Sequence, residues 1–197
     1  MKFYFIRHWR TKFNLTGQMV KNYDDVDIVS DYPDDWQEKV GKFVPDTNYI
    51  LSSPVKRCKQ TCKLLFNKEP LGCLSEFGEF DCSGIGKLKF WEMTKEEFEK
   101  LVPLTSKDME TRAHQIFNVL VEYLGNENVK DVIVISHGML IRYLYHYLNG
   151  NPNITPFQVI NSEGFYFANC DLMVYDTETK QIEIHRYKEP TKHGKKK

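Results

Sequence analysis

Two short apolar runs constrain the fold of this chain more than any other feature. Residues 3–6 read Phe-Tyr-Phe-Ile and residues 132–135 read Val-Ile-Val-Ile, with no charged residue in either run. Such a run is typical of a strand buried on both faces, as in the parallel sheets of α/β proteins. Segments with helical spacing alternate with the strand-like runs, so the sequence predicts a three-layer α/β/α sandwich with a mostly parallel central sheet.

A histidine lies just beyond the end of each run. His8 follows Ile6 and Arg7, and His137 follows Ile135 and Ser136. Ligands of open α/β sheets bind in the crevice outside the carboxyl ends of the strands, so two histidines far apart in the sequence can meet there. A pair of imidazoles at this edge of the sheet suggests chemistry at phosphorus.

Length and charge limit the classes of protein to consider. With 197 residues and 41% hydrophobic residues, the chain can form one domain over residues 1–190, and residues 191–197 read as a basic flexible tail. The 27 cationic and 27 anionic side chains cancel, so no overall field favours a nucleic acid polymer or a membrane as partner.

No run is long enough for a signal peptide or a membrane span, and five cysteines without a Cys-x-x-Cys pair argue against disulfides and structural zinc. We therefore expect a cytoplasmic protein.

Capping signals predict where helices begin. Ser53 as N-cap and Pro54 in the first turn predict a helix over residues 55–65, after a strand over residues 49–52. Arg57 then lies in the first turn of that helix, where free N–H groups and the helix dipole favour an anion. The other predicted elements are a helix over residues 34–43, a helix opening with the Thr94/Glu97 capping box, a helix from Thr105 to Gly125, a helix from Met139 to Leu148, and a hairpin of residues 165–175 and 182–187.

The stretch from residue 71 to residue 104 is rich in glycines, aromatics and charges. We expect a small lid or substrate segment around residues 77–104. Trp36, Phe90 and Trp91 either line a substrate pocket or belong to the core, because large aromatic residues serve both purposes.

Four segments together resemble the histidine phosphatase superfamily, which contains the cofactor-dependent phosphoglycerate mutases. In order they are Arg7-His8-x-x-Thr11-x-x-Asn14, Ser52-Ser53-Pro54-x-x-Arg57-x-x-Gln60-Thr61, Leu74-Ser75-Glu76 and Ser136-His137-Gly138. Asn14-Leu15-x-Gly17 and Asn169-Cys170 are similar too. Each motif is weak by itself, but the order and spacing match the family over nearly the whole chain.

The resemblance assigns a role to each polar residue. It implies that His8 is the nucleophile that becomes a phosphohistidine, that His137 donates a hydrogen bond to a phosphoryl oxygen, and that Glu76 is the general acid and base. Arg7, Arg57 and Asn14 would hold the phosphate, because a phosphomonoester dianion repels nucleophiles until positive charge surrounds it. Glu79 and Asp81 follow closely and remain alternatives to Glu76.

The chain departs from the family pattern after the nucleophile. Trp9 and Arg10 stand where the family has a glycine and often an acidic residue, and Ser83-Gly84 replaces an acidic residue before glycine. Trp9 can narrow the pocket, stack on a planar substrate or point into the core. Arg10 can favour a substrate with a second anionic group. Trp9, Arg10 and Gly138 are therefore candidate substrate-binding residues.

Hydrolysis is the predicted reaction, with a small phosphorylated molecule as substrate. The short stretch between Glu76 and Thr105, and Gln18 where mutases tend to carry an arginine, favour a phosphatase over a phosphoglycerate mutase-type phosphotransferase. A catalytically inactive relative that binds a phosphorylated ligand is a third hypothesis, motivated by Trp9. Two arginines neutralise the phosphate, so we expect neither a metal ion nor a cofactor. A homodimer is compatible with the sequence.

Overall fold

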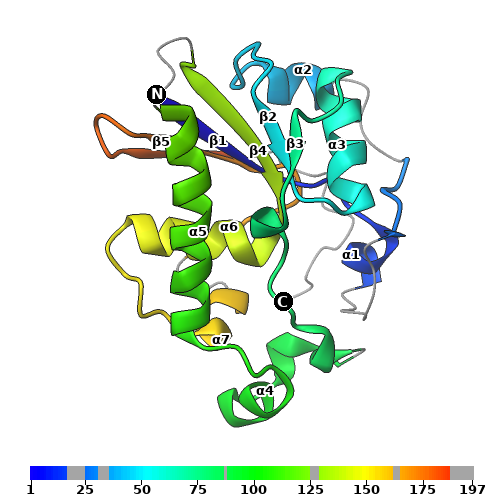
Figure 1. Cartoon of the computed structure of the whole chain (residues 1–197). Helices are drawn as coiled ribbons and strands as arrows, with labels where there is room; N and C mark the ends of the chain where they lie inside the picture. Colours follow the sequence, from blue (N-terminus) through cyan, green and yellow to red (C-terminus); the bar gives the residue numbers. More distant parts are fainter. Residues whose placement is uncertain (17–24, 31–35, 87, 125–128, 162–164, 187–197) are drawn as a thin grey trace.

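The computed structural model describes residues 1–16, 25–30, 36–86, 88–124, 129–161 and 165–186. The predicted basic tail, the end of a helix at Gly125, and Gln18 lie outside these residues. A six-stranded sheet forms the centre of the molecule, in the order β3-β2-β4-β1-β5-β6 (Figure 1). The strands are β1 (Lys2–Arg7), β2 (Ile50–Ser52), β3 (Gly72–Cys73), β4 (Asp131–Ser136), β5 (Leu172–Asp176) and β6 (Ile182–His185).

The sheet is mostly parallel, as the sequence predicts. β1, β4, β2 and β3 run parallel to one another, whereas β5 pairs antiparallel with both β1 and β6. Arg7 at the end of β1 lies opposite Ser136 at the end of β4. His8 and His137, one residue further along each strand, therefore leave the sheet at the same edge.

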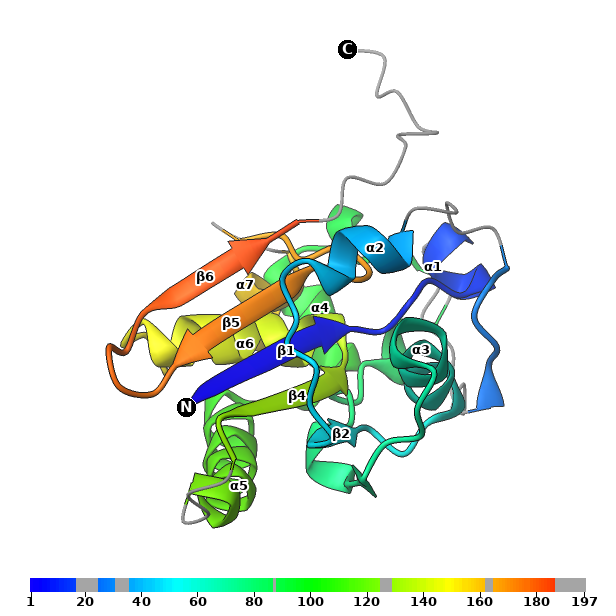
Figure 2. The same cartoon turned by 90° about the horizontal axis from the view of Figure 1, so that it is seen from above.

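Helices cover both faces of the sheet (Figures 1 and 2). Phe3, Phe5 and Val134 pack on the face covered by α5 (Ser106–Leu124) and α6 (Gly138–Leu148). Tyr4 and Ile133 point to the opposite face, where α3 (Lys56–Phe66) contributes buried cysteines. Both faces of β1 and β4 are buried, which explains why their sequences are continuously apolar.

The remaining elements are short. They are α1 (Lys12–Thr16), α2 (Trp36–Gly41), α4 (Lys95–Leu101), α7 (Pro156–Ile160), and the 3-10 turns η2 (Ser75–Phe77), η3 (Ser83–Ile85) and η4 (Phe90–Glu92). The Thr94/Glu97 capping box opens α4, as predicted. The helix α7 has its own capping box, formed by Thr155 and Gln158, which the sequence analysis missed. Within the described residues, no helix is long and apolar enough to cross a membrane.

Two predicted boundaries are wrong. The helix α3 begins at Lys56 with Val55 as N-cap, so Ser53 does not cap it. The strand β5 begins at Leu172 rather than at residue 165. Cys170 has a φ of 63°, and the Asp171 carboxylate accepts a hydrogen bond from the Ala168 N–H at 2.7 Å, so the chain turns just before this strand.

Candidate active site

His8 is fixed by hydrogen bonds on both sides of its ring. Its Nδ1 lies 2.6 Å from the Trp9 carbonyl oxygen, which can only accept, so Nδ1 carries the proton. Its Nε2 then has a free lone pair and accepts a hydrogen bond from Nε of Arg57 at 3.3 Å. The side chain is buried. The geometry therefore presents Nε2, rather than Nδ1, as the reactive atom.

His137 lies beside His8 because β1 and β4 are neighbours. The two ring centroids are 5.2 Å apart with an angle of 67° between the planes. Nδ1 of His137 lies 3.2 Å from Nη2 of Arg57, and Nε2 lies 2.9 Å from the hydroxyl of Ser53. An arginine donates only, so Nδ1 is the acceptor and Nε2 carries the proton toward Ser53.

Arg57 joins the two imidazoles. It lies in the first turn of α3, where the sequence predicts it, and is only 1% exposed. Burial lowers the pKa of both His8 and His137 well below 6.5, and the positive charges of Arg57 and Arg7 lower both pKa values further. Both histidines are therefore neutral near pH 7.

Arg7 approaches the same site from the end of β1. Its Nη1 donates to the Phe167 carbonyl at 2.6 Å, while its buried Nε has no hydrogen-bond partner among the described residues. A side chain on Gly138 would place Cβ 2.9 Å from Cζ of Arg7. Glycine after His137 is therefore needed for the position of Arg7, and contact of Gly138 with a substrate stays a prediction.

Asn14 reaches the site through a second asparagine. Its Oδ1 accepts a hydrogen bond from the Thr11 N–H at 2.9 Å, which leaves the amide Nδ2 as its donor. Nδ2 of Asn169 lies 2.8 Å from the His8 carbonyl and 3.5 Å from Oδ1 of Asn14. Asn169 therefore ties the end of β1 to the turn before β5 and to α1.

Three carboxylates of the segment after β3 have different surroundings. Glu79 accepts hydrogen bonds from the N–H groups of Met139 and Leu140 at 3.1 and 2.9 Å, so it holds the first turn of α6. Asp81 accepts from the Ser83 N–H at 2.9 Å. Glu76 is half-buried, and the hydrogen bond recorded for its carboxylate comes from the Ser75 hydroxyl at 3.3 Å.

The loop that carries Glu76 is fastened to the end of β4. The hydroxyl of Ser136 donates to the Phe77 carbonyl at 2.7 Å, and Arg112 of α5 donates to the Ser75 carbonyl at 3.3 Å. Ser136 also accepts the His8 N–H through its carbonyl at 2.9 Å. One residue at the end of β4 thus connects the nucleophile candidate with the acid candidate.

Trp9 is a core residue. It is fully buried against Val40 and Cys170, and its indole N–H donates to the Val29 carbonyl at 3.1 Å. Of the three interpretations of Trp9, the structure favours the one in which it points into the core. Arg10 lies over the Trp9 ring at 5.3 Å, on the outer side of this cluster.

The aromatic candidates near the predicted lid are on the surface or at its edge. Trp91 is 52% exposed and contacts the ring of Phe90 edge to face at 5.0 Å. Neither Phe90 nor Trp91 makes a hydrogen bond or a ring contact with His8 or His137. Contact of these two aromatic residues with a substrate therefore stays a prediction. The side chain of Trp36 lies outside the described residues.

Ser53 and Cys58 are the neighbours of His137 that sequence reasoning missed. Sγ of Cys58 lies 3.6 Å from Nε2 of His137, and burial raises the pKa of this thiol to about 12. The position of Ser53 directly after β2 could have indicated this contact, because β2 pairs with β4 and His137 directly follows β4. Within the described part of the chain, no group of three or more His, Cys, Asp or Glu side chains is arranged to hold a metal ion.

Comparison with known proteins decides the family. A model of the histidine phosphatase superfamily (branch 1) matches residues 3–190. The chain belongs to the histidine phosphatase superfamily. A search of curated protein sequences found no match.

Several solved structures have the same fold as this histidine phosphatase superfamily member. A mutant phosphoserine phosphatase from Entamoeba histolytica, in complex with phosphoserine, has a TM-score of 0.71 and 17% identity over 94% of this chain and 95% of that one. YhfR from Bacillus stearothermophilus has a TM-score of 0.67 and 15% identity over 93% and 94%. The alpha-ribazole phosphatase from Shigella flexneri has a TM-score of 0.59 and 13% identity over 94% and 95%. At these identities the likeness concerns the fold.

Proposed function

We propose that this protein hydrolyses a small phosphomonoester through a covalent phosphohistidine on His8, with Glu76 as general acid and base. The observation that carries the proposal is the buried His8–Arg57–His137 cluster, in which one guanidinium contacts both imidazoles. Membership of the histidine phosphatase superfamily supports the same chemistry.

The His8–Arg57–His137 cluster can exchange partners when a phosphate enters. Arg57 gives up its contacts with the two imidazoles and donates to phosphoryl oxygens, which releases the lone pair on Nε2 of His8. Nε of Arg7, a buried donor that has no partner among the described residues, gains one in the bound state. Nδ2 of Asn14 is a neutral donor for the same group.

His137 takes up a proton from solvent when the substrate binds. Its Nδ1 accepts a hydrogen bond from Arg57, so it has no proton there to donate to a phosphoryl oxygen. A phosphate dianion raises the pKa of a neighbouring imidazole, because the opposite charge stabilises the cation. Protonated His137 then donates to the phosphoryl oxygen while Nε2 keeps its contact with Ser53.

His8, Glu76 and one water molecule supply every group that the two chemical steps need. Nε2 of His8 attacks phosphorus, the bond from phosphorus to the alkoxide breaks, and Glu76 protonates the leaving alkoxide. Water then attacks phosphorus as Glu76 takes its proton, the nitrogen–phosphorus bond breaks, and inorganic phosphate leaves. Positive charge from Arg7 and Arg57 serves the purpose that a metal ion serves in other phosphatases, so we expect activity without a metal.

The first test is hydrolysis of an aryl phosphate between pH 5 and 8 with EDTA present. We expect metal-free turnover in the natural protein, and a loss of at least about 10³-fold in His8→Ala, because removing the nucleophile leaves only binding and charge stabilisation. Quenching with alkaline SDS during turnover should trap phosphate on the natural protein and none on His8→Ala, because a phosphorus–nitrogen bond survives alkali and hydrolyses in acid.

Three results would contradict the proposal. They are a strict requirement for Mg²⁺ or Zn²⁺, undiminished turnover in His8→Ala, or tight binding of phosphorylated metabolites by the natural protein without any turnover. The third result would support the binding protein considered from the sequence. Transfer of phosphate to a second hydroxyl in preference to water would support the mutase-type reaction.

A further inference from the structure

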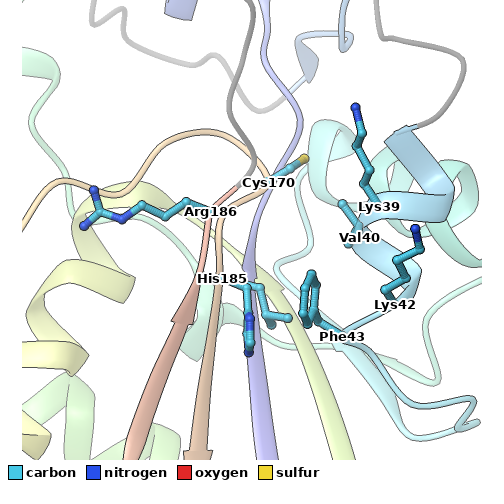
Figure 3. Close-up of a pocket in the computed structure, with 8 residues that line it drawn as sticks. Lys39, Val40, Lys42, Phe43, Cys170, His185 and Arg186 are labelled. Atoms are coloured by element: carbon cyan, nitrogen blue, oxygen red, sulfur yellow. The ribbon is translucent and has the colours of Figure 1, made fainter.

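A cleft of about 380 Å³ lies between the region around α2 and the C-terminal strands (Figure 3). Lys39 and Val40 of α2, with Lys42 and Phe43 just after it, form one wall. Leu172 of β5 and His185 of β6 form the other, together with Cys170 and Arg186. None of the residues assigned to the phosphate site lines this cleft. Its size falls in the range of small-molecule sites, which begins at about 300 Å³.

The inner surface of the cleft is mostly apolar. Val40, Cys170 and Leu172 are buried and supply its floor. The rings of Phe43 and His185 are stacked, with centroids 4.2 Å apart and an angle of 19° between the planes. The Phe43 side chain is nevertheless half-exposed, so an apolar ring stands open to solvent here. A planar apolar group can cover that ring and the floor beneath it.

Two positively charged side chains lie on the α2 side of the opening. Lys39, Lys42 and Arg186 belong to the lining, and none of the eight described lining residues is acidic. Lys42 lies 3.1 Å from Glu38, but both side chains are more than 60% exposed (62% and 72%), so this ion pair is weak and exchangeable. Arg186 extends away from the two lysines, with its guanidinium 5.9 Å from the Phe165 ring centroid (Figure 3). The two lysines are therefore the cations best placed to meet a ligand.

We propose that this cleft binds a small planar aromatic anion, at a second site that is distinct from the phosphate site. The apolar floor and the open Phe43 ring select the flat body, and the lysines at the rim select the negative group.

The cleft shares a wall with the catalytic end of the sheet. Val40 and Cys170 form one hydrophobic cluster with Trp9, whose carbonyl accepts the hydrogen bond from Nδ1 of His8. The Cys170 N–H also donates to the Arg7 carbonyl at 2.9 Å. The second site is thus packed behind the residues of the phosphate site without including them.

The probe for the test is 1-anilinonaphthalene-8-sulfonate, an aromatic sulfonate with a planar naphthalene ring that fluoresces when it leaves water. We expect saturable binding of one probe per chain. Phe43→Ala should raise the Kd by at least about 10-fold, since buried aromatic contacts dominate small interfaces. Lys39→Gln with Lys42→Gln should raise it by about 3- to 10-fold at low salt and less at high salt.

Matched controls distinguish the cleft from other surfaces. Leu71→Ala removes another exposed apolar side chain, and Lys59→Gln with Lys63→Gln removes two exposed lysines of α3; neither should change the Kd. Thermal unfolding of every variant shows whether it is folded. Inorganic phosphate and His8→Ala should leave probe binding unchanged, which separates this proposal from the proposed hydrolysis.

The proposal is overturned by any of four results in folded proteins. They are binding that does not saturate, equal affinities of Phe43→Ala and Leu71→Ala, displacement of the probe by inorganic phosphate, or binding that occurs only after residues 187–197 are removed. The last result would identify the chain's own C-terminus as the occupant.

Discussion

Gly138 shows how one residue sets the position of another across the site. The guanidinium of Arg7 lies where a side chain on residue 138 would project, with Cζ and Nε both 2.9 Å from the position of that Cβ. Arg7 cannot retreat without losing its hydrogen bond to the Phe167 carbonyl. Packing against Gly138 therefore fixes the position of the Arg7 guanidinium before any substrate is bound.

We predict that Gly138→Ala lowers kcat/KM for phosphomonoester hydrolysis by about 10²-fold, because an ångström-scale displacement of a positioning group has a cost of that order. Steady-state kinetics measures it. Gly41→Ala is the control, since a methyl group there meets no atom within 4 Å and should leave kcat/KM unchanged. Equal kinetics of the two variants would show that the position of Arg7 does not depend on Gly138.

The sequence located Arg57 and both histidines, but it left the contacts of Ser53 and Trp9 undecided. Arg57 is in the predicted first turn, and the motifs name both histidines. Ser53 has two uses with the same sequence context, a helix cap or a partner of His137, and only the strand order β2-β4-β1 decides between them. Trp9 likewise follows His8 in the sequence, but its side chain is turned into the core.

At the scale of elements, the loop around η2 separates two glutamates that are three residues apart. Glu79 binds the first turn of α6, where N–H groups and the helix dipole stabilise a carboxylate. The carboxylate of Glu76 contacts the neighbouring Ser75 hydroxyl, and the loop beneath it is fastened through Phe77 and Arg112. This division of contacts favours Glu76 as the acid.

The matched variants Glu76→Gln and Glu79→Gln should therefore have different effects. We predict that Glu76→Gln lowers kcat by about 10²- to 10⁴-fold for substrates with poor leaving groups, with unchanged stability. Glu79→Gln should lower the free energy of unfolding by about 1 kcal/mol, as for loss of a helix cap, with a much smaller effect on kcat. Kinetics and urea unfolding measure both. If Glu79→Gln instead removes activity while stability is kept, Glu79 is the acid.

Local signals predicted the starts of two helices whose stabilising contacts are also local. Thr94 and Glu97 form the capping box of α4, and Thr105 and Asp108 exchange hydrogen bonds before α5. The stretch before β5 was wrongly predicted as strand because its apolar residues resemble one, whereas the turn at Cys170 depends on contacts with β1.

At the scale of the whole molecule, burial of two neutral histidines makes stability depend on pH. The pKa values of His8 and His137 are lowered well below 6.5 by burial and by the arginines. Above pH 6.5 both imidazoles are neutral in the folded and the unfolded chain. Below it the unfolded chain binds protons that the folded chain does not, so stability must fall as the pH decreases from 6.5 toward the lowered values.

We predict that the urea midpoint falls between pH 7.5 and pH 5, and that this fall is smaller in His137→Asn than in the natural protein. His114→Asn is the control, because His114 is exposed and should leave the slope unchanged. Urea unfolding at a series of pH values measures the effect. A midpoint that rises on acidification would contradict it, since that would mean that folding favours the charged imidazoles.

The sequence by itself determined the class of fold, the two histidines, the two arginines and the family. These follow from apolar runs, capping signals and motifs. Each of these signals involves a few residues that are close together in the sequence. Only the tertiary structure decided the tautomers of His8 and His137, the partner of Ser53, the packing of Trp9, the division between Glu76 and Glu79, and the cleft beside α2. Each of these depends on which strands are neighbours and which surfaces are covered. The physical reason is that hydrogen bonds and burial depend on which residues are close in space. Residues far apart in the sequence become close only when the strands assemble into the sheet.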